Sequence, residues 1–467
     1  MNTSNNRPES PAGPPGPPGR VRRDLTQGSI LKNLMILSWP ILVTQLMMTL
    51  GPTIDTIWVG RLGETAIAAV GVAGTAVMLV MGLMMGFTMG MLALLSRAIG
   101  AGDNHMASRI AQQSIVFSAI FAFVIALVGQ FLGQKILLLI TQDPGIVELG
   151  TIYLRIEFLG GATMVFRMTM DTIMQSSGDT FNPMWIAAVY RVIHIILCPF
   201  MIFGWWIFPE LGVAGAAWTA VIAQGIGVIL GLRVLFSERS RVRVSFKDFK
   251  FDPVILWRII RIGIPASIGG IQRSLSQFIL QVLMAPFGPA ALAAHVIAQR
   301  IEMFFFMPAM SFGNGAGVLA GQNLGAGKPE RAEKGAWLAV AILEAFIVVV
   351  IIIMLVWTKP IVNIFNSEPG LEAIAIQYIR IAAVGWIMMG FMFALMNTMQ
   401  SAGDTTMMMI FSILDTWLVT ILLAWLLPRY TDLGVLGIRW AMSASVIVGG
   451  LINVFYFRTG RWKKKKV

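Results

Sequence analysis

The chain has 467 residues, of which 57% are hydrophobic and only 12% are charged. This composition is not that of a water-soluble globular protein, and we expect an integral membrane protein. The net charge of +12 does not indicate nucleic-acid binding, because no soluble basic domain with interspersed aromatic residues is present. A single cysteine excludes an internal disulfide, and three histidines argue against a His/Cys metal centre.

The chain begins with a polar segment rich in proline and glycine, residues 1–28, which is predicted to be a disordered cytoplasmic tail. The first apolar run, residues 34–60, is long enough to cross a bilayer, which takes about 20 apolar residues. Pro40 lies inside this run and is its predicted hinge, because proline removes a backbone hydrogen bond and bends a helix. Asp55 follows fifteen residues later, and a carboxylate in a spanning helix marks a functional site.

Apolar runs separated by glycine, proline and charged residues predict twelve spanning helices. They are expected near residues 31–59, 66–95, 108–133, 150–176, 182–207, 211–236, 254–286, 290–320, 332–357, 372–400, 405–427 and 435–458. The predicted fold class is therefore an all-α polytopic membrane protein.

Lysine and arginine gather on one side when these helices are threaded alternately across a membrane. That side holds Arg20, Arg22, Arg23, Lys32, the basic residues of 239–261, Lys328, Arg331, Lys334 and the lysine run at 463–466. By the positive-inside rule this side is cytoplasmic. We therefore expect a multi-pass protein of the cell (inner or plasma) membrane with both termini in the cytoplasm.

The two halves of the chain align without a gap at one constant offset in residue number. Examples are Pro40 and Pro265 (265 − 40 = 225), and the phrases MQSSGDT and MQSAGDT that end at Thr180 and Thr405 (405 − 180 = 225). Each half holds six predicted helices, so both enter the membrane in the same direction, as in parallel-repeat transporters. We expect two pseudo-symmetric six-helix lobes around a central cleft. The expected divisions are an N-lobe at 29–236, a cytoplasmic linker at 237–253, a C-lobe at 254–458 and a basic cytoplasmic tail at 459–467.

Four motifs occur in a characteristic order: Trp39-Pro40 followed by Asp55-Thr56, GAGD at 100–103, GQNLGAGKPERA at 321–332, and the paired GDT turns. Together they resemble the multidrug and toxic compound extrusion (MATE) family of efflux transporters, over about residues 28–458. The resemblance implies twelve helices in two lobes and an export cycle driven by H⁺ or Na⁺. It also implies amphipathic, often cationic organic substrates. The wider superfamily includes lipid-linked oligosaccharide flippases.

The chain departs from the resembled family at the coupling site. In the prokaryotic branch that it resembles most, an aspartate on helix 1 acts with an N-x-x-x-D pair on helix 5. Asp55 matches that aspartate, but His194 and Cys198 stand at the positions of the helix 5 pair. The other branch uses a glutamate on helix 7, and this chain has Arg273 near the corresponding place.

Further ionisable residues at membrane depth occupy helix faces that must point inward, because lipid does not accept them. Arg167 and Asp171 are spaced i, i+4, and Arg191 and His194 are spaced i, i+3. The predicted N-lobe cluster comprises Asp55, Arg167, Asp171, Arg191, His194 and Cys198. Ion coupling is assigned to Asp55, Asp171 and His194, with Asp171 replacing the missing helix 5 carboxylate. The alternatives are static salt bridges between helices and, for His194, a hydrogen-bonded core position.

The substrate cavity is predicted between the lobes. Its candidate residues are Gln45, Met48, Phe166, Arg273 and Asp415, with Asp415 as a contact for a cationic substrate. Flexible methionine side chains suit a pocket that accepts many shapes. Glu302 is expected to pair internally with Arg300 or Arg273.

These observations predict an antiporter that exports small organic compounds by alternating access, coupled to H⁺ in preference to Na⁺. The expected partners are the small-molecule substrate and the lipid bilayer, without nucleic acid, metal or cofactor apart from the coupling ion, and the expected functional unit is a monomer. A lipid or lipid-linked glycan flippase is the alternative on the same scaffold. An intramembrane enzyme is the third, and no nucleophile or metalloprotease motif supports it.

Overall fold

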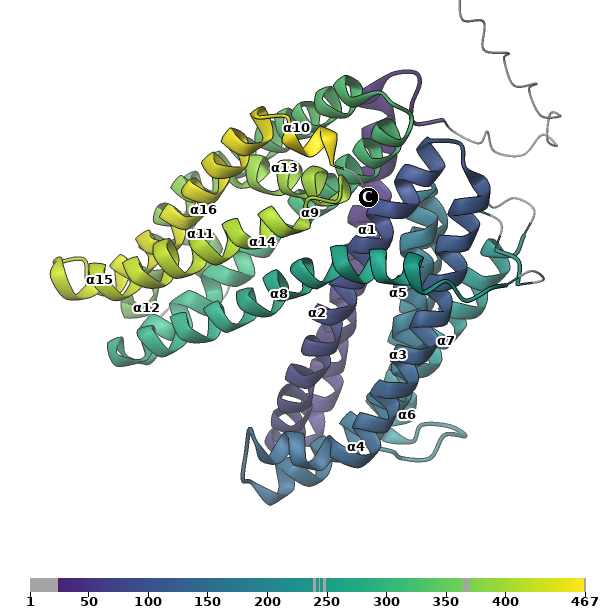
Figure 1. Cartoon of the computed structure of the whole chain (residues 1–467). Helices are drawn as coiled ribbons and strands as arrows, with labels where there is room; N and C mark the ends of the chain where they lie inside the picture. The colour runs from purple at the N-terminus through teal and green to yellow at the C-terminus, as the bar shows by residue number, and fades with distance from the viewer. Residues whose placement is uncertain (1–23, 238–240, 243, 247–248, 364–368, 466–467) are drawn as a thin grey trace, which may run out of the picture.

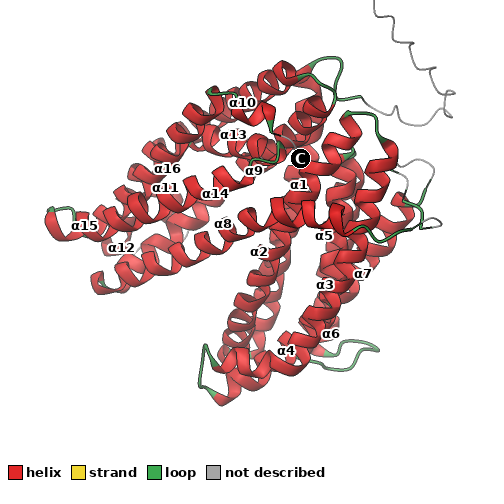
Figure 2. Cartoon of the chain, viewed as in Figure 1, coloured by secondary structure: helices red, strands yellow, loops and turns green. Residues whose placement is uncertain are grey.

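The structure, a computed structural model, describes residues 24–237, 241–242, 244–246, 249–363 and 369–465. Within these residues every regular element is helical and no strand occurs (Figure 2). The N-terminal half contains α1 (Ile30–Val59), η1 (Gly60–Leu62), α2 (Glu64–Gly100), α3 (Asn104–Leu138), α4 (Pro144–Leu159), α5 (Gly161–Ser176), α6 (Phe181–Phe203) and α7 (Val213–Leu235). The C-terminal half contains α8 (Pro253–Met284), η2 (Ala285–Phe287), α9 (Pro289–Gly325), α10 (Pro329–Val356), α11 (Thr358–Asn363), α12 (Pro369–Trp386), α13 (Met389–Ser401), α14 (Thr405–Leu414), the π-helical η3 (Asp415–Ile421), α15 (Leu422–Tyr430), α16 (Val435–Arg458) and η4 (Arg461–Lys464).

Among the described residues, ten helices are long and apolar enough to cross a membrane, and two bent helix pairs bring the number to twelve. The predicted all-α polytopic fold is therefore confirmed. The single helices expected at 150–176 and 372–400 are corrected, because each is a pair of helices, bent by 45° at α4–α5 and by 48° at α12–α13.

Both bends lie near glycines that the repeat relates, Gly160 and Gly385 (385 − 160 = 225). Gly160 lies against Val221 of α7, and a side chain on Gly385 would meet Ser443 of α16 at 3.0 Å. Glycine lets one helix approach another this closely. The bends thus follow from close packing inside each lobe, which the apolar pattern does not reveal.

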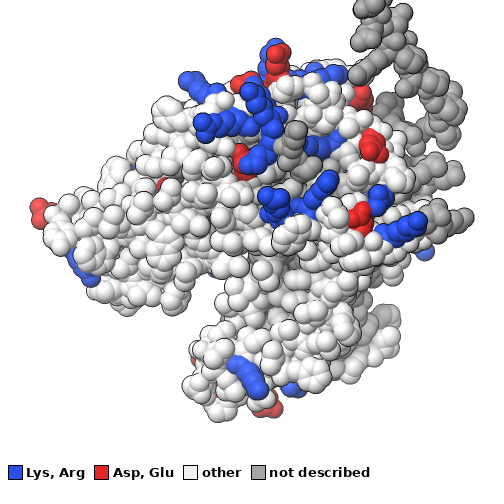
Figure 3. All heavy atoms as spheres, in the orientation of Figure 1, with Lys and Arg blue, Asp and Glu red and all other residues white. Residues whose placement is uncertain are grey.

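The repeat is also visible in the helix boundaries. Helices α2 and α9 begin at Glu64 and Pro289, and α3 and α10 begin at Asn104 and Pro329, in each case with the offset of the sequence repeat (289 − 64 = 225 and 329 − 104 = 225). The two pseudo-symmetric lobes are α1–α7 and α8–α16, which form two diverging arms in Figure 1. Figure 3 shows a notch hollowed between the arms.

The arms meet where α2 packs against α8 and α9, and α1 against α9. A side chain on Gly86 of α2 would meet the backbone nitrogen of Ser267 in α8 at 2.7 Å, and Gly90 faces the backbone of Ile259. Gly82, one turn earlier, faces no atom within 4 Å. Gly86 and Gly90 therefore set the distance between the lobes.

The ends of the described chain are attached to this junction. Leu25 falls in the predicted disordered tail, yet it is 1% exposed and packs with Leu37, Met89 and Leu319. Residues 1–23 lie outside the described residues. Trp462 is fully buried beside Phe457, and Lys and Arg side chains gather over this end of the molecule in Figure 3. Residues 24–28 and 459–465 are thus part of the folded body.

Replacing Gly86 with alanine is expected to destabilise the protein by about 1–3 kcal/mol, because the added methyl group has no room against the α8 backbone. Gly82→Ala is the matched control on the same helix and is expected to be neutral. Thermal unfolding of the purified variants in detergent compares the two. Equal midpoints would contradict a tight α2–α8 junction.

Candidate functional site

Helix α1 contains two prolines, Pro40 and Pro52. Proline lacks the N–H that bonds the carbonyl four residues earlier, so each one leaves a carbonyl without its helical donor. The carbonyl that Pro40 leaves free, that of Ile36, accepts a hydrogen bond from the Thr180 hydroxyl at 3.0 Å. The predicted hinge at Pro40 is therefore bonded to the GDT turn before α6.

The second break lies close to the predicted coupling aspartate and was not considered in the sequence analysis. Pro52 frees the carbonyl of Met48, which accepts a hydrogen bond from Arg191 Nη2 at 3.4 Å. Arg191 Nε also donates to the carbonyl of Met47 at 2.6 Å. The guanidinium of α6 thus binds α1 where proline has interrupted the helix.

Asp55 is 7% exposed and lies one turn beyond Pro52. Its Oδ1 is 3.2 Å from His194 Nε2 and accepts a hydrogen bond from Cys198 Sγ at 3.6 Å. Both partners come from α6, on the face that the i, i+4 spacing predicts. The structure thus places three of the predicted residues together.

The hydrogen bonds define the tautomer of His194. Arg191 Nη1 lies 3.3 Å from His194 Nδ1, and a guanidinium only donates hydrogen bonds. Nδ1 is therefore the acceptor, and Nε2 carries the proton that His194 donates to Asp55. A continuous chain of contacts runs from the Asp55 side chain through the His194 ring to Arg191 and the α1 backbone.

Arg167 and Asp171 form a separate pair on α5, 2.6 Å apart. Arg167 lies over the ring of Tyr190 at 5.2 Å, and Arg191 lies over the same ring at 5.3 Å. Tyr190 therefore connects this pair to the Asp55 chain. Asp171 is bonded to Arg167, and no direct contact to Asp55 is found for it in the described part of the protein.

A further acid lies in the N-lobe. It is Glu157 of α4, which is half-buried and follows the buried Tyr153 by one helical turn. Glu157 is not among the residues predicted for the site, although it directly follows the repeated phrase YLRI. Its repeat-related residue is Ala382 (157 + 225), so the C-lobe has no acid at the related position.

The same asymmetry holds throughout the cluster. The C-lobe positions that the repeat relates to Asp55, Arg167, Asp171, Arg191 and His194 are Leu280, Met392, Met396, Thr416 and Val419. The two lobes therefore share a scaffold but not this chemistry.

The C-lobe contains its own buried charges, arranged differently from expectation. Glu302 pairs with Arg439 of α16, and not with Arg300 or Arg273 as predicted. Arg439 is 1% exposed, and Trp386 Nε1 also donates to Glu302, at 3.4 Å. Because the partner lies 137 residues further along the chain, local spacing could not identify it.

Arg273 lines a small pocket between α2, α8, α9 and α13, near the junction of the lobes. Its neighbours there include Met85, Met89, Met310 and Met396. The other predicted cavity residues do not line this pocket: Gln45, Met48 and Phe166 are half-buried in the N-lobe, and Asp415 is buried inside the C-lobe.

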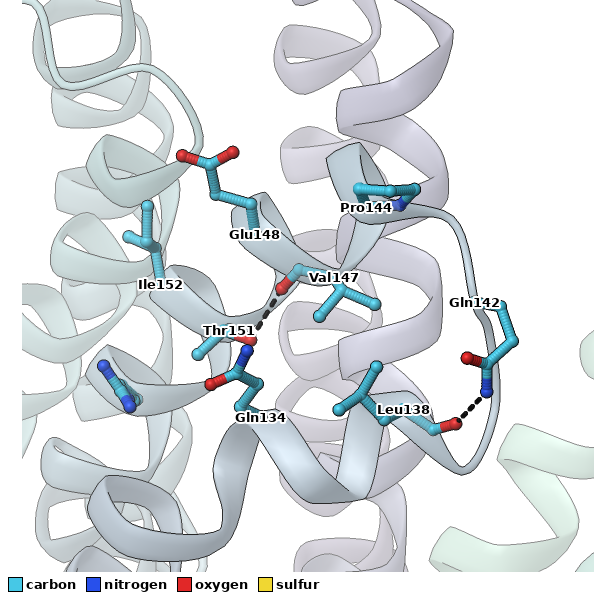
Figure 4. Close-up of a pocket in the computed structure, with 9 residues that line it drawn as sticks. Gln134, Leu138, Gln142, Pro144, Val147, Glu148, Thr151 and Ile152 are labelled. Atoms are coloured by element: carbon cyan, nitrogen blue, oxygen red, sulfur yellow. Dashed lines mark hydrogen bonds between the residues drawn. The ribbon is translucent and has the colours of Figure 1, made fainter.

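A second pocket lies at the tip of the N-lobe, between α3 and α4 (Figure 4). Two of its polar side chains bond nearby backbone: Gln142, in the loop after α3, donates to the Leu138 carbonyl, and Thr151 of α4 donates to the Val147 carbonyl. Glu148 points away from these bonds in Figure 4. This pocket lacks convergent polar groups and is not a candidate binding site. Throughout the described ranges, no three His, Cys, Asp or Glu side chains group as metal ligands.

Comparison of the sequence with protein-family models shows the family to which the chain belongs. The MatE family model matches residues 40–200 and 265–426, two segments whose starts differ by the repeat offset (265 − 40 = 225). The chain belongs to the MATE family. It is accordingly a multi-pass membrane transporter and not an enzyme.

Curated relatives match along nearly their whole length. "Probable multidrug resistance protein YoeA" of Bacillus subtilis is 26% identical, with 96% of this chain and 97% of the relative covered. "Probable multidrug resistance protein NorM" of Thermotoga maritima is 27% identical, with 94% of each covered.

Solved structures share the fold. A crystal structure of MATE in the bent conformation has a TM-score of 0.88 at 23% identity, covering 94% of this chain and 98% of that one. A transporter of the MOP superfamily from Pyrococcus furiosus has a TM-score of 0.87 at 24% identity, covering 95% and 98%. For that transporter, the reverse polarity of the binding pocket suggests a different function.

The bond between Arg191 and the Pro52 break is testable by a double-mutant cycle. In Pro52→Ala the new N–H can bond the Met48 carbonyl, so Arg191→Met should destabilise that variant less than it destabilises the wild type. The expected coupling is about 1 kcal/mol, measured by thermal unfolding and by amide hydrogen exchange in α1. Thr180→Val, which removes the donor at the other proline, should be additive with Pro52→Ala. If the effects of Arg191→Met and Pro52→Ala on stability are also additive, Arg191 does not bond the carbonyl that Pro52 leaves free.

Proposed function

We propose that this MATE protein is an H⁺-coupled antiporter that exports amphipathic, often cationic organic compounds by alternating access. The observation that carries the proposal is the buried chain from Asp55 through His194 to Arg191, because it joins a protonatable acid to the broken backbone of α1. The names of the curated relatives, which describe multidrug resistance proteins, support the substrate class.

The surroundings of Asp55 favour H⁺ over Na⁺. Hard cations such as Na⁺ take oxygen ligands, whereas the nearest partners of Asp55 Oδ1 are an imidazole N–H and a thiol S–H. Both are hydrogen-bond donors to a carboxylate, and neither supplies an oxygen. A proton needs no such ligand shell.

In the proposed cycle a proton from outside neutralises Asp55. The carboxyl then no longer needs the His194 N–H, so His194 and Arg191 are released from their fixed arrangement. Arg191 leaves the Met47 and Met48 carbonyls, and α1 repacks at Pro52, with Pro40 as the second point of bending. The proton acts by binding one lobe arrangement better than the other, since equal affinity would shift no population.

The distribution of basic residues supports an orientation for this cycle. The notch in Figure 3 opens away from the face on which Lys and Arg gather. By the positive-inside rule that basic face is cytoplasmic. We therefore propose an outward-open arrangement in the cell membrane, with both termini inside. The lobes at 29–236 and 254–458 move against each other, joined by the linker at 237–253, and a monomer suffices.

One observation favours a second function. Arg273 places a positive charge among methionines in the pocket near the junction, which suits an anionic amphiphile such as a lipid or lipid-linked glycan. The flippase alternative therefore remains a candidate. The first candidate needs the substrate to bind toward Gln45, Met48 and Phe166 in the N-lobe.

Asp55→Asn is expected to abolish efflux driven by a pH gradient, because the residue can no longer exchange a proton. The measurement uses proteoliposomes with a pH gradient alone or a sodium gradient alone, and a panel of cationic and anionic amphiphiles. Glu148→Gln, which removes an exposed acid of α4, is the matched control and should transport normally. Wild-type efflux by Asp55→Asn would refute the coupling assignment, and transport of anionic lipids alone would favour the flippase.

Glu157 and Asp171 are expected to differ when neutralised. Glu157→Gln should leave the stability largely unchanged, because no ion pair among the described residues involves Glu157. Asp171→Asn should instead lower stability by about 3–5 kcal/mol, because Arg167 is left buried and unpaired. Two measurements on each variant distinguish an effect on coupling from an effect on stability: efflux as a function of pH, and the midpoint of thermal unfolding. A pH shift in Asp171→Asn with normal stability would restore Asp171 as the replacement carboxylate.

A further inference from the structure

Asp415 is a buried acid that the N-lobe chain does not involve. It begins η3, where a π-helical segment interrupts the span formed by α14 and α15. Such segments are rare and occur often at functional sites. Asp415 is 9% exposed at membrane depth, where an unpaired carboxylate is strongly disfavoured.

The hydrogen bonds of Asp415 are incomplete. Ser445 of α16 donates to Oδ2 at 2.7 Å, while Oδ1 is buried and has no hydrogen-bond partner. Gln272 of α8 donates to the Ser412 carbonyl at 2.8 Å, three residues before Asp415, and its own Oε1 is also buried and unpaired. This region therefore contains two buried oxygen acceptors and too few donors.

The charged residues on the packed helices have other partners. Arg439 of α16 pairs with Glu302, Arg458 lies over Trp337, and Arg429 of α15 lies over Trp425. On α8, Arg273 lines the junction pocket, and Arg258 and Arg261 lie more than two turns before Gln272. Helix α14 carries no charged residue. In the part of the chain that the structure describes, no Lys, Arg or His forms an ion pair with Asp415.

The repeat relates Asp415 and Gln272 to residues at the Arg191 contact of the N-lobe. Asp415 corresponds to Tyr190, and Gln272 corresponds to Met47 (415 − 190 and 272 − 47, both 225). In the N-lobe, Arg191 beside Tyr190 binds the carbonyl of Met47. The C-lobe thus has an acid, Asp415, at the position of Tyr190, next to the position of the Arg191 guanidinium. It has an amide, Gln272, at the position of Met47, whose carbonyl binds that guanidinium.

We propose that Asp415 is a second proton-binding carboxylate, enclosed in the C-lobe, which takes up and releases H⁺ during transport. The proton comes from water and forms an O–H bond on Oδ1, which turns an unpaired acceptor into a donor and removes the buried charge. Oxygens such as Ser445 Oγ and the unpaired Gln272 Oε1 are also ligands that Na⁺ takes, so the test below separates H⁺ from Na⁺. The role in transport rests on the proposed H⁺ coupling, whereas proton binding itself does not.

Difference infrared spectroscopy of the purified full-length protein tests proton binding directly, through the carboxyl C=O band during a pH titration without substrate. We expect Asp55→Asn to retain a titrating band that Asp55→Asn combined with Asp415→Asn lacks. Asp415→Glu should restore a titrating band, and Ser445→Ala should shift its frequency, since the carboxyl loses a hydrogen bond. Asp432→Asn, at an exposed loop acid, is the control that should keep the band.

The proposal is overturned if the double variant, folded by its thermal midpoint, keeps every titrating band of Asp55→Asn. It is also overturned if the band responds to NaCl at constant pH but not to pH itself, which would reveal a sodium site. In proteoliposomes, Asp415→Asn should lower the number of protons moved per substrate about twofold. Loss of pH-driven efflux in Asp55→Asn is a separate measurement. If Asp415 proves not to bind a proton, the assignment of Asp55 to H⁺ coupling is unaffected. If Asp55 proves not to couple transport to H⁺, proton binding by Asp415 is unaffected.

Discussion

A backbone carbonyl released by proline inside a membrane needs a new hydrogen-bond donor, because lipid offers none. Helix α1 has two such carbonyls, and each finds its donor on another element: Thr180 for Ile36, and Arg191 for Met48. The position of α1 therefore depends on α6 and on the turn before it. A change of charge that moves Arg191 acts directly on the helix that carries Asp55.

The duplicated scaffold separates architecture from chemistry. The starts of α2, α3 and α4, the glycines at both bends and the starts of the matched family segments recur at the offset of 225 in the C-terminal half, whereas the cluster of ionisable groups around Asp55 does not. The N-lobe holds acids and arginines in one connected cluster, while the C-lobe holds the Glu302–Arg439 pair and, apart from it, Asp415. In the proposed H⁺-coupled cycle, two lobes with the same packing therefore respond to a proton differently, which is what a cycle with a direction requires.

The sequence predicted what periodicity and spacing determine. The apolar runs located the spans, and the spacing of His194 and Cys198 placed both on the face that meets Asp55. Glu157 could not be predicted in the same way, because its direction depends on the bend between α4 and α5, which in turn depends on Gly160 meeting α7. The Glu302–Arg439 pair joins residues on two distant helices. Such contacts arise from tertiary packing, on which the local pattern carries no information.

The geometry of His194 limits the ways in which a proton can enter the N-lobe. In the proposed H⁺-coupled cycle Arg191 occupies Nδ1 and Asp55 occupies Nε2, so the Asp55 carboxylate is the group that we propose takes up the proton. If a proton instead reached Nδ1, the two cations would repel and Arg191 would leave the α1 carbonyls. Neutralising Asp55 has the same end result, because the His194 N–H then loses the charge that orients the ring. In the proposed mechanism both routes loosen α1 at Pro52, so the H⁺ coupling that we propose depends on Arg191 binding the broken helix and not on a unique proton path.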